Sequence, residues 1–310
     1  MTPRNRMIGA ALLITILGDA ELGRGHDSWL ADEPPVDPKK STEIPAAPDS
    51  AAWVWFCTGD HFPISDHATQ AERVARWFVQ NRQGRLAAVG GLQTDGAALR
   101  GRAPIDRNGH PVERLIVAAE LHPRLIELTP EKFEAYLREE HAAEALQEFQ
   151  RSRPTGPVRE LYTKHASAIL SGKVRVEAAG ESGGSPVLAV SPNPERTTPG
   201  QSDAASRMEV RPVDWDLPLT AGSEAEFEVL FEGKPRPGLH VASGREGMAA
   251  HAYTQTLVTD SRGRVRFQFR EPGRWFLRTH TIRKTTDPKV QQAEWESSWA
   301  SISFRIGNAK

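Results

Sequence analysis

The sequence predicts a mainly β protein built of two β-sandwich-like domains, the first of which carries a helical hairpin. Three observations support this fold class. Short runs of alternating apolar and polar residues recur between turns that contain Gly and Pro. An amphipathic stretch with a proline in its first turn follows Thr129. A segment dense in Gly, Ser and Pro, residues 178–206, lies between two regions with strand patterns, and we expect it to be a linker.

Residues 1–25 predict a cleaved signal peptide. Two arginines near the start precede an apolar run at residues 7–18, which is too short to cross a hydrocarbon layer of about 30 Å as a helix. Small residues place the cleavage before His26, and an earlier cut after Ala20 is the alternative. We therefore expect a periplasmic or secreted chain without a transmembrane helix after cleavage.

The first folded region, residues 26–177, combines strands with two helices. A helix is expected to open at Thr129-Pro130, with the hydroxyl as cap and the proline in the first turn, and to carry an apolar stripe from Phe133 to Phe149. A second helix is expected over about 157–170, where apolar side chains share one face. The predicted strands are 53–57, 114–119 and 124–128, and residues 74–79 are either a strand or the end of a short helix.

The second folded region, residues 207–307, alternates more clearly and predicts an antiparallel β-sandwich. The turn Asp260–Gly263 places a glycine where a positive φ is needed. On the strand ending at Thr279, Trp275 and Leu277 share one face while Phe276, Arg278 and His280 share the other. The predicted strands are 225–231, 239–242, 255–259, 265–269, 275–279 and 299–306.

Composition and motifs exclude several classes of protein. The formal net charge of −1 argues against a polybasic nucleic-acid binder, so we expect no nucleic-acid partner. A single cysteine, Cys57, excludes an internal disulfide and is expected to be buried and inert. The sequence contains no HExxH, P-loop or GxGxxG motif, and its GxSxG string at residues 180–184 falls in the expected linker and not at a strand-to-helix elbow, so hydrolase and nucleotide chemistry have no support and we expect no enzyme.

His26 is the first candidate metal ligand. If cleavage follows Gly25, its α-amine and imidazole can chelate one metal ion in a single ring, and the amine titrates near neutral pH. The adjoining Asp27 then offers an oxygen ligand, or a carboxylate that orients the ring. The alternative is that HDSWL only begins the first strand, with Trp29 and Leu30 in the core and His26 at its edge.

His280 is the second candidate, because imidazole is a common ligand of late first-row metals. Glu294 or Glu296 would add a carboxylate, unless the pair only fixes a loop. The predicted ligand set is thus His26, Asp27, His280, Glu294 and Glu296. The loop GDHFPISDH, residues 59–67, offers further ligands but is expected to be solvated. His240 and His251 lack metal-site spacing, and His165 is expected to be a hydrogen-bonded core residue.

The order of segments resembles a NikM-like periplasmic family of unknown function, catalogued as the periplasmic component of ABC-type cobalt/nickel transport. His165 departs from that family, which often has a cysteine at this position. The C-terminal region also resembles the transthyretin-like, or prealbumin-like, modules of secreted proteins. The segments that carry these resemblances are HDSWL (26–30), RLIELTPEKFEAYLREEH (124–141), RELYTKHASAIL (159–170), GKPRPG (233–238), TDSRGRVRF (259–267), PGRWFLRTH (272–280) and AEWESSWASISF (293–304).

These observations predict an exported metal-binding protein that assists transition-metal uptake, with a metal ion or chelate and a membrane transporter as partners. The resemblance implies cobalt or nickel, whereas the general affinity order favours copper at a nitrogen-rich site. The alternative is a non-catalytic β-sandwich module that binds another exported protein or a glycan. A metalloenzyme that uses the His26 chelate is a third, weaker hypothesis.

Overall fold

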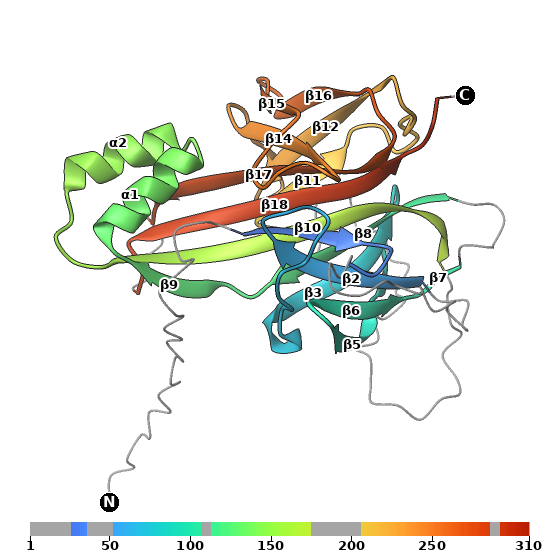
Figure 1. Cartoon of the computed structure of the whole chain (residues 1–310), viewed down its shortest axis with the longest axis horizontal. Helices are drawn as coiled ribbons and strands as arrows, with labels where there is room; N and C mark the ends of the chain where they lie inside the picture. The colour runs from blue at the N-terminus through green and yellow to red at the C-terminus, as the bar shows by residue number, and fades with distance from the viewer. Residues whose placement is uncertain (1–25, 36–51, 107–112, 175–205, 286–291, 310) are drawn as a thin grey trace, which may run out of the picture. The chain divides into compact units, whose positions relative to one another are not determined.

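The computed structural model describes residues 26–35, 52–106, 113–174, 206–285 and 292–309 (Figure 1). The chain divides into two compact units. The larger unit comprises His26–Pro123, Tyr162–Ile282 and Ser297–Lys310, and the smaller unit includes Arg124–Leu161 and Arg283–Glu296. The predicted signal peptide and residues 178–205 of the predicted linker lie outside the described residues. Within the described ranges, no helix is both long and apolar enough to span a bilayer.

The described residues form three β-sheets. The first has the order β1-β2-β6-β5, with β1 (Asp27–Ala31), β2 (Ala52–Gly59), β6 (Ala98–Ala103) and β5 (Gly90–Asp95). The second, ten-stranded, contains β15 (Gln255–Val258), β14 (His240–Arg245), β17 (Gly273–Lys284), β18 (Trp295–Ile306), β10 (Val158–Val174), β8 (Glu113–Leu121), β3 (Val74–Asn81) and β4 (Gly84–Ala88) in that order, with β7 (Ile105–Asp106) and β9 (Arg124–Leu128) paired to β10. The third contains β11 (Met208–Pro212), β12 (Ser223–Phe231), β13 (Lys234–Pro235) and β16 (Arg264–Phe269).

In the larger unit the ten-stranded sheet is the middle of three layers, because both of its faces are apolar. On β8, Leu115 and Val117 pack in one core with β1, β2 and β6, while Ile116 and Ala118 pack in a second core with β11, β12 and β16. Figure 1 shows β12 and β16 on one side of β18 and β10, and β2 and β6 on the other. A middle layer buried on both faces explains why β8 is nearly continuous in apolar residues.

The alternation predicted for β17 and β18 is confirmed. Trp275 and Leu277 of β17 lie in the core with the third sheet, as do Ala300 and Ile302 of β18. Phe276 points the other way, and its ring contacts that of Phe62 at a centroid distance of 4.7 Å.

Strand β1 has both faces buried and only one paired edge. It pairs antiparallel with β2, and the carbonyl groups of Ser28 and Leu30 on its free edge accept hydrogen bonds from the hydroxyls of Ser301 and Ser303. The Ser-x-Ser spacing on β18 matches the two-residue repeat of carbonyls along one edge of a strand. Trp29 and Leu30 of β1 lie in the core, as the alternative interpretation of HDSWL expects.

The smaller unit contains α1 (Pro130–Glu139) and α2 (Ala143–Ser152). The Thr129 hydroxyl accepts a hydrogen bond from the Lys132 amide, as the sequence predicts for a helix cap. Phe133, Phe149 and Trp295 pack together with ring centroids 5.2–6.2 Å apart. Buried Glu160 accepts a hydrogen bond from the Tyr136 hydroxyl at 3.3 Å.

The structure corrects two helix predictions. The helix expected over 157–170 is wrong, because these residues belong to β10 and pair with β8 from His165↔Glu120 to Gly172↔Glu113. The long-range ladder outweighs the helical propensity of this stretch. The helix expected to continue from Thr129 to Phe149 is divided in two around His141, whose φ is 54°.

The ten-stranded sheet also takes strands from both sides of the predicted linker: β10 precedes residues 178–206, and β14, β17 and β18 follow them. The two regions distinguished in the sequence therefore share this sheet.

If both faces of β8 pack against a hydrophobic core, Leu115→Ala and Ile116→Ala should each lower the free energy of unfolding by about 2–5 kcal/mol. Each substitution leaves a cavity in a different core. Leu86→Ala, at a side chain 41% exposed, is the matched control and should change it by less than about 0.5 kcal/mol. Urea denaturation measures all three. A negligible effect of either core variant would contradict the three-layer arrangement.

Candidate metal centre

The register of β1 against β2 places His26 opposite Asp60. The pairs run Asp27↔Gly59 and Ser28↔Thr58, so one further step in an antiparallel ladder brings residue 26 beside residue 60. The His26 Nδ1 and the Asp60 Oδ1 are 2.8 Å apart, which is hydrogen-bond distance. Both side chains are about three-quarters buried, with exposed fractions of 24% and 21%.

The loop after β2 places a second carboxylate, that of Asp66, close to Asp60. Ser65 is buried and its hydroxyl donates to the carbonyl of Ala97, while the Asp66 amide donates to the carbonyl of Thr58. The Asp66 Oδ2 then accepts the Asp60 amide at 3.0 Å. Gly59 makes this possible, because a Cβ there would lie 2.6 Å from the Asp66 Oδ2 and 2.7 Å from the carbonyl oxygen of Ile64.

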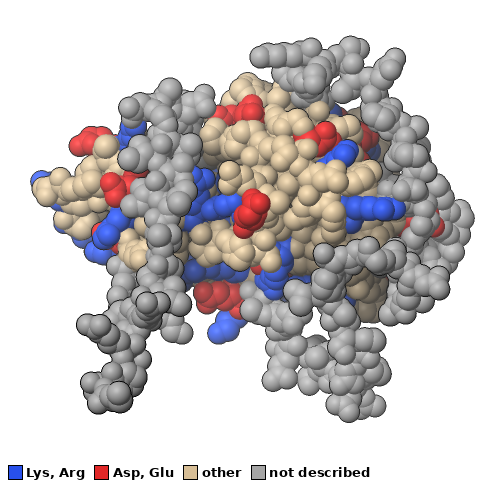
Figure 2. Space-filling model, turned by 90° about the horizontal axis from the view of Figure 1, so that it is seen from below, with Lys and Arg blue, Asp and Glu red and all other residues tan. Residues whose placement is uncertain are grey.

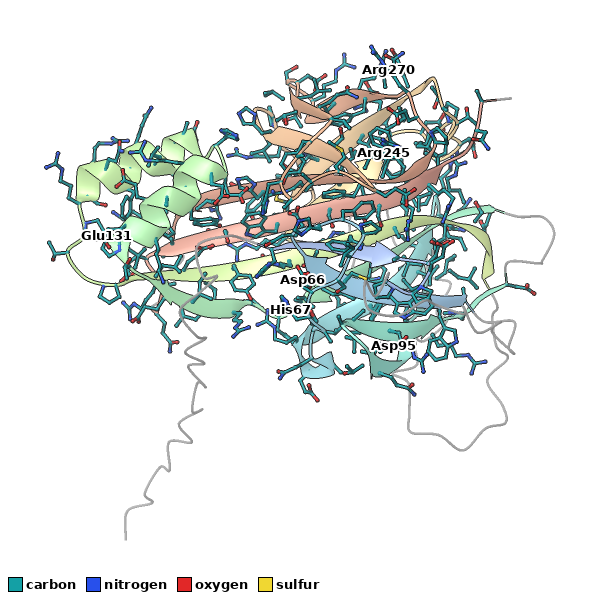
Figure 3. All side chains as sticks on the ribbon, in the orientation of Figure 1. Asp66, His67, Asp95, Glu131, Arg245 and Arg270 are labelled. Carbon is teal, nitrogen blue, oxygen red and sulfur yellow. The ribbon has the colours of Figure 1, made fainter. Side chains whose placement is uncertain are left out.

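His26, Asp60 and Asp66 consequently converge. Each offers a ligand atom, and these atoms lie within 4.8 Å of one another. The ring of His67 stands edge-on to that of His26 at a centroid distance of 5.2 Å, and Figure 3 shows Asp66 and His67 side by side. Partial burial and the neighbouring His26 and Lys164 lower the pKa of His67, so its imidazole is neutral over more of the physiological pH range.

His251, from the loop between β14 and β15, adds a further imidazole to this group. Its Nε2 lies 3.7 Å from the Asp60 Oδ1, which is too far for a hydrogen bond. That nitrogen is buried and has no hydrogen-bond partner among the described residues. The Asp60 carboxylate therefore faces two imidazole nitrogens from opposite ends of the chain.

Buried charged side chains fix the start of β1 next to this group. Lys164 on β10 donates to the His26 carbonyl at 2.6 Å and contacts the Ser28 hydroxyl at 3.2 Å. Burial lowers the pKa of Lys164 to about 8, and the opposite charge of Asp27 counters only part of that change.

Asp27 pairs with Arg278 at 2.9 Å, and both side chains are less than a tenth exposed. Burial raises the pKa of the Asp27 carboxyl, while the guanidinium of Arg278 acts in the opposite direction. Arg278 also lies over the ring of Trp299, 5.1 Å from its centroid. This pair fixes the first residue of β1 to β17.

A small cavity of about 10 Å³ adjoins these charges, with room for about one water molecule. His165 lines it, is 5% exposed, and has no hydrogen-bond partner for either ring nitrogen among the described residues. His165 is thus buried as predicted, but it lacks the expected hydrogen bond. Burial lowers its pKa, with Glu209, Glu120 and Arg76 as the charged groups around it.

A larger open pocket of about 400 Å³ lies elsewhere and has different chemistry. Arg82, Glu113, Arg114, Trp215 and Asp216 are among its lining residues. Its charges are already paired or hydrogen-bonded: Arg82 lies 2.6 Å from Asp216, and Arg114 donates to the Trp215 carbonyl. The described residues that line the pocket offer neither an imidazole nor a thiol, so they do not form a candidate transition-metal site.

The structure brings only His26 of the five predicted ligands into the convergent group. Asp27 pairs with Arg278, and the ring of His280 stacks on Trp299 at 4.7 Å. Glu294 and Glu296 belong to the smaller unit: Glu294 accepts three hydrogen bonds from Arg159, and Glu296 accepts a hydrogen bond from Arg283. Although burial opposes it, the bonds from Arg159 hold the pKa of Glu294 below its ordinary value.

The loop at residues 59–67 was expected to be solvated, but it supplies Asp60 and Asp66 to the convergent group. The density of Asp and His in that loop was the available signal, but nothing in the sequence placed it beside His26. His251 carried no local signal, because its partners lie almost two hundred residues earlier.

On the face seen in Figure 2, the basic side chains of the described residues form no continuous patch. Among the described residues there, Lys and Arg are interspersed with Asp and Glu and with uncharged side chains.

Comparisons with known proteins give one family and one solved structure. Residues 191–283 match a family described as a domain of unknown function (DUF4198), a stretch that includes His251. No curated protein matches the chain. A solved structure entitled "D0-D1 domain of Intimin" aligns with 8% identity over 83% of this chain and 91% of its own, at a TM-score of 0.19.

Removal of the Asp27 charge should destabilise the fold strongly. Asp27→Asn leaves Arg278 buried without its counter-charge, and we expect a loss of about 3–5 kcal/mol in the free energy of unfolding. Asp216→Asn at the exposed pair with Arg82 is the control and should cost about 0–1 kcal/mol. Equal losses in urea denaturation would show that the Asp27–Arg278 pair has no special role.

Buried His165 should make the protein less stable in mild acid. Its pKa is lower in the folded chain than the usual 6.5, so the unfolded chain binds a proton first and stability falls as the pH drops below that value. Urea denaturation at pH 7.5 and 5.5, with a chelator present, should show a smaller loss for His165→Leu than for the wild type. Exposed His122→Gln should behave as the wild type. An unchanged loss in His165→Leu would contradict the assignment.

Proposed function

We propose that this protein is an exported metal-binding protein that captures a transition-metal ion at His26, Asp60 and Asp66. The observation that carries the proposal is the convergence of their ligand atoms within 4.8 Å. Imidazole nitrogen with carboxylate oxygen suits zinc, copper, nickel or cobalt, whereas magnesium and calcium prefer all-oxygen sites. Two carboxylates would balance the charge of a divalent ion.

Export is part of the proposal, because it determines what His26 contributes. Cleavage of residues 1–25 would leave His26 with a free α-amine, which can bind the same ion as its ring. Lys164 supports this role, since its ammonium group holds the His26 carbonyl and so fixes the residue that would become the amino terminus. The proposed activity is capture without catalysis.

The resemblance to a NikM-like periplasmic family supports a role in cobalt or nickel uptake, with a membrane transporter as partner. The nitrogen donors make copper the competitor to test. The transthyretin-like character of residues 207–307 belongs to the same proposal, as does the assignment of the mature chain to the periplasm or the secreted fraction.

The direct test is metal titration of the mature, untagged protein by calorimetry with Ni²⁺, Co²⁺ and Cu²⁺ separately. His26→Ala and Asp60→Asn should each weaken binding by about 100-fold, since the first removes the imidazole and the second replaces an anionic carboxylate by a neutral amide. Exposed His122→Ala is the control. Affinity should also fall from pH 7.5 to 5.5, because protons compete for the imidazole nitrogens.

Mass spectrometry of the same preparation establishes the amino terminus. Absence of binding by the wild type for all three ions, or undiminished binding by both variants, would refute metal capture at this site. A start other than His26 would remove the amine ligand but leave the side-chain site.

A second candidate function is a module that binds another exported protein or a glycan. The observation in its favour is β15, which is the last strand of the ten-stranded sheet and carries Val258 with 53% exposure. Val258→Lys would block a partner at this edge without affecting metal binding, so the two functions are separable in one preparation.

A further inference from the structure

The 246–254 loop places the imidazole of His251 beside the Asp60 carboxylate, where its Nε2 has no hydrogen-bond partner among the described residues. Its loop is fixed at both ends: the Glu246 amide donates to the Arg274 carbonyl, and the Thr254 amide donates to the Ser243 carbonyl. Tyr253, the second residue after His251, accepts a hydrogen bond from Arg278, which itself pairs with Asp27 next to His26. The loop is therefore tied to the same buried pair that fixes β1.

The backbone of His251 is in an unfavourable conformation. Its φ is 54°, in the left-handed region that favours glycine. The side chain is 18% exposed, and the Nε2 atom is buried without a hydrogen-bond partner among the described residues. A strained backbone and an unpartnered buried nitrogen each lower the stability of the fold, and such features concentrate at functional sites.

The distances around Asp60 fit metal coordination. With metal–ligand bonds of about 2.0–2.1 Å, neighbouring ligand atoms stand about 2.9 Å apart at 90° and about 3.3 Å apart at the tetrahedral angle. The Asp60 Oδ1 is 2.8 Å from the His26 Nδ1 and 3.7 Å from the His251 Nε2. His251 is not in the group whose ligand atoms all lie within 4.8 Å of one another, so its ring would have to move toward His26 for one ion to contact all three atoms.

We propose that His251 is a ligand of the metal ion captured at His26 and Asp60, so that the site contains two side-chain imidazoles from distant parts of the chain. This inference rests on the proposed metal capture and extends it. The second imidazole makes the site selective for late first-row ions over calcium and magnesium. Because one ligand lies in the 246–254 loop and the others in β1 and the loop after β2, the bound ion joins these segments.

His251→Gly is the decisive variant, because glycine removes the imidazole and also tolerates the positive φ. Without metal it should unfold at the same temperature as the wild type or higher. Its Cu²⁺ affinity, measured by competition with a chelator, should be at least about 10-fold weaker. Pulsed electron paramagnetic resonance of the Cu²⁺ form should detect one imidazole fewer than in the wild type, and the rise in melting temperature caused by Cu²⁺ should shrink.

The matched control is His240→Ala, which removes an exposed histidine from the preceding strand β14 and should change none of these quantities. Unchanged affinity and imidazole number in His251→Gly would overturn the inference, while loss of binding in His26→Ala would still uphold metal capture. If the wild type itself binds no Cu²⁺, Ni²⁺ or Co²⁺, both fail together.

Discussion

The candidate site depends on the way in which β1 is fixed. This five-residue strand pairs with β2 along one edge, and its opposite edge is occupied by hydroxyl groups from β18 and by the ammonium group of Lys164. An exposed edge would leave carbonyl groups unsatisfied and the register free to slip. Here the register is fixed, and it places His26 opposite Asp60.

The contacts that fix β1 also contribute to the stability of the whole fold. The Asp27–Arg278 pair is costly to bury, and it is tolerated because Arg278 also reaches Tyr253 and the face of Trp299. These contacts bring together the start of the described chain, β17, β18 and the 246–254 loop. This buried network is the scaffold of the proposed metal centre, since it positions both His26 and the loop that carries His251.

Much of the fold was predictable from local patterns. Alternation identified the strands of residues 207–307 and the face shared by Phe276, Arg278 and His280. It failed at residues 157–170, because LYTKHASAIL has helix-forming residues and its partner strand β8 lies some fifty residues earlier. His26 was identifiable from its position after the predicted cleavage point. Asp66 was recognisable only as part of a loop rich in ligands, and its position beside His26 was not predictable, because its approach depends on Gly59 and the turn that follows it.

His26 and Asp60 are the proposed ligands on which metal capture depends. The most direct test is a crystal structure of the mature protein soaked with Ni²⁺ or Cu²⁺, with data collected at the absorption edge of the metal. We expect an anomalous peak about 2.0–2.1 Å from a ring nitrogen of His26 and within bonding distance of the Asp60 carboxylate. A fully ordered site with no peak there, or a peak only at other residues, would contradict it.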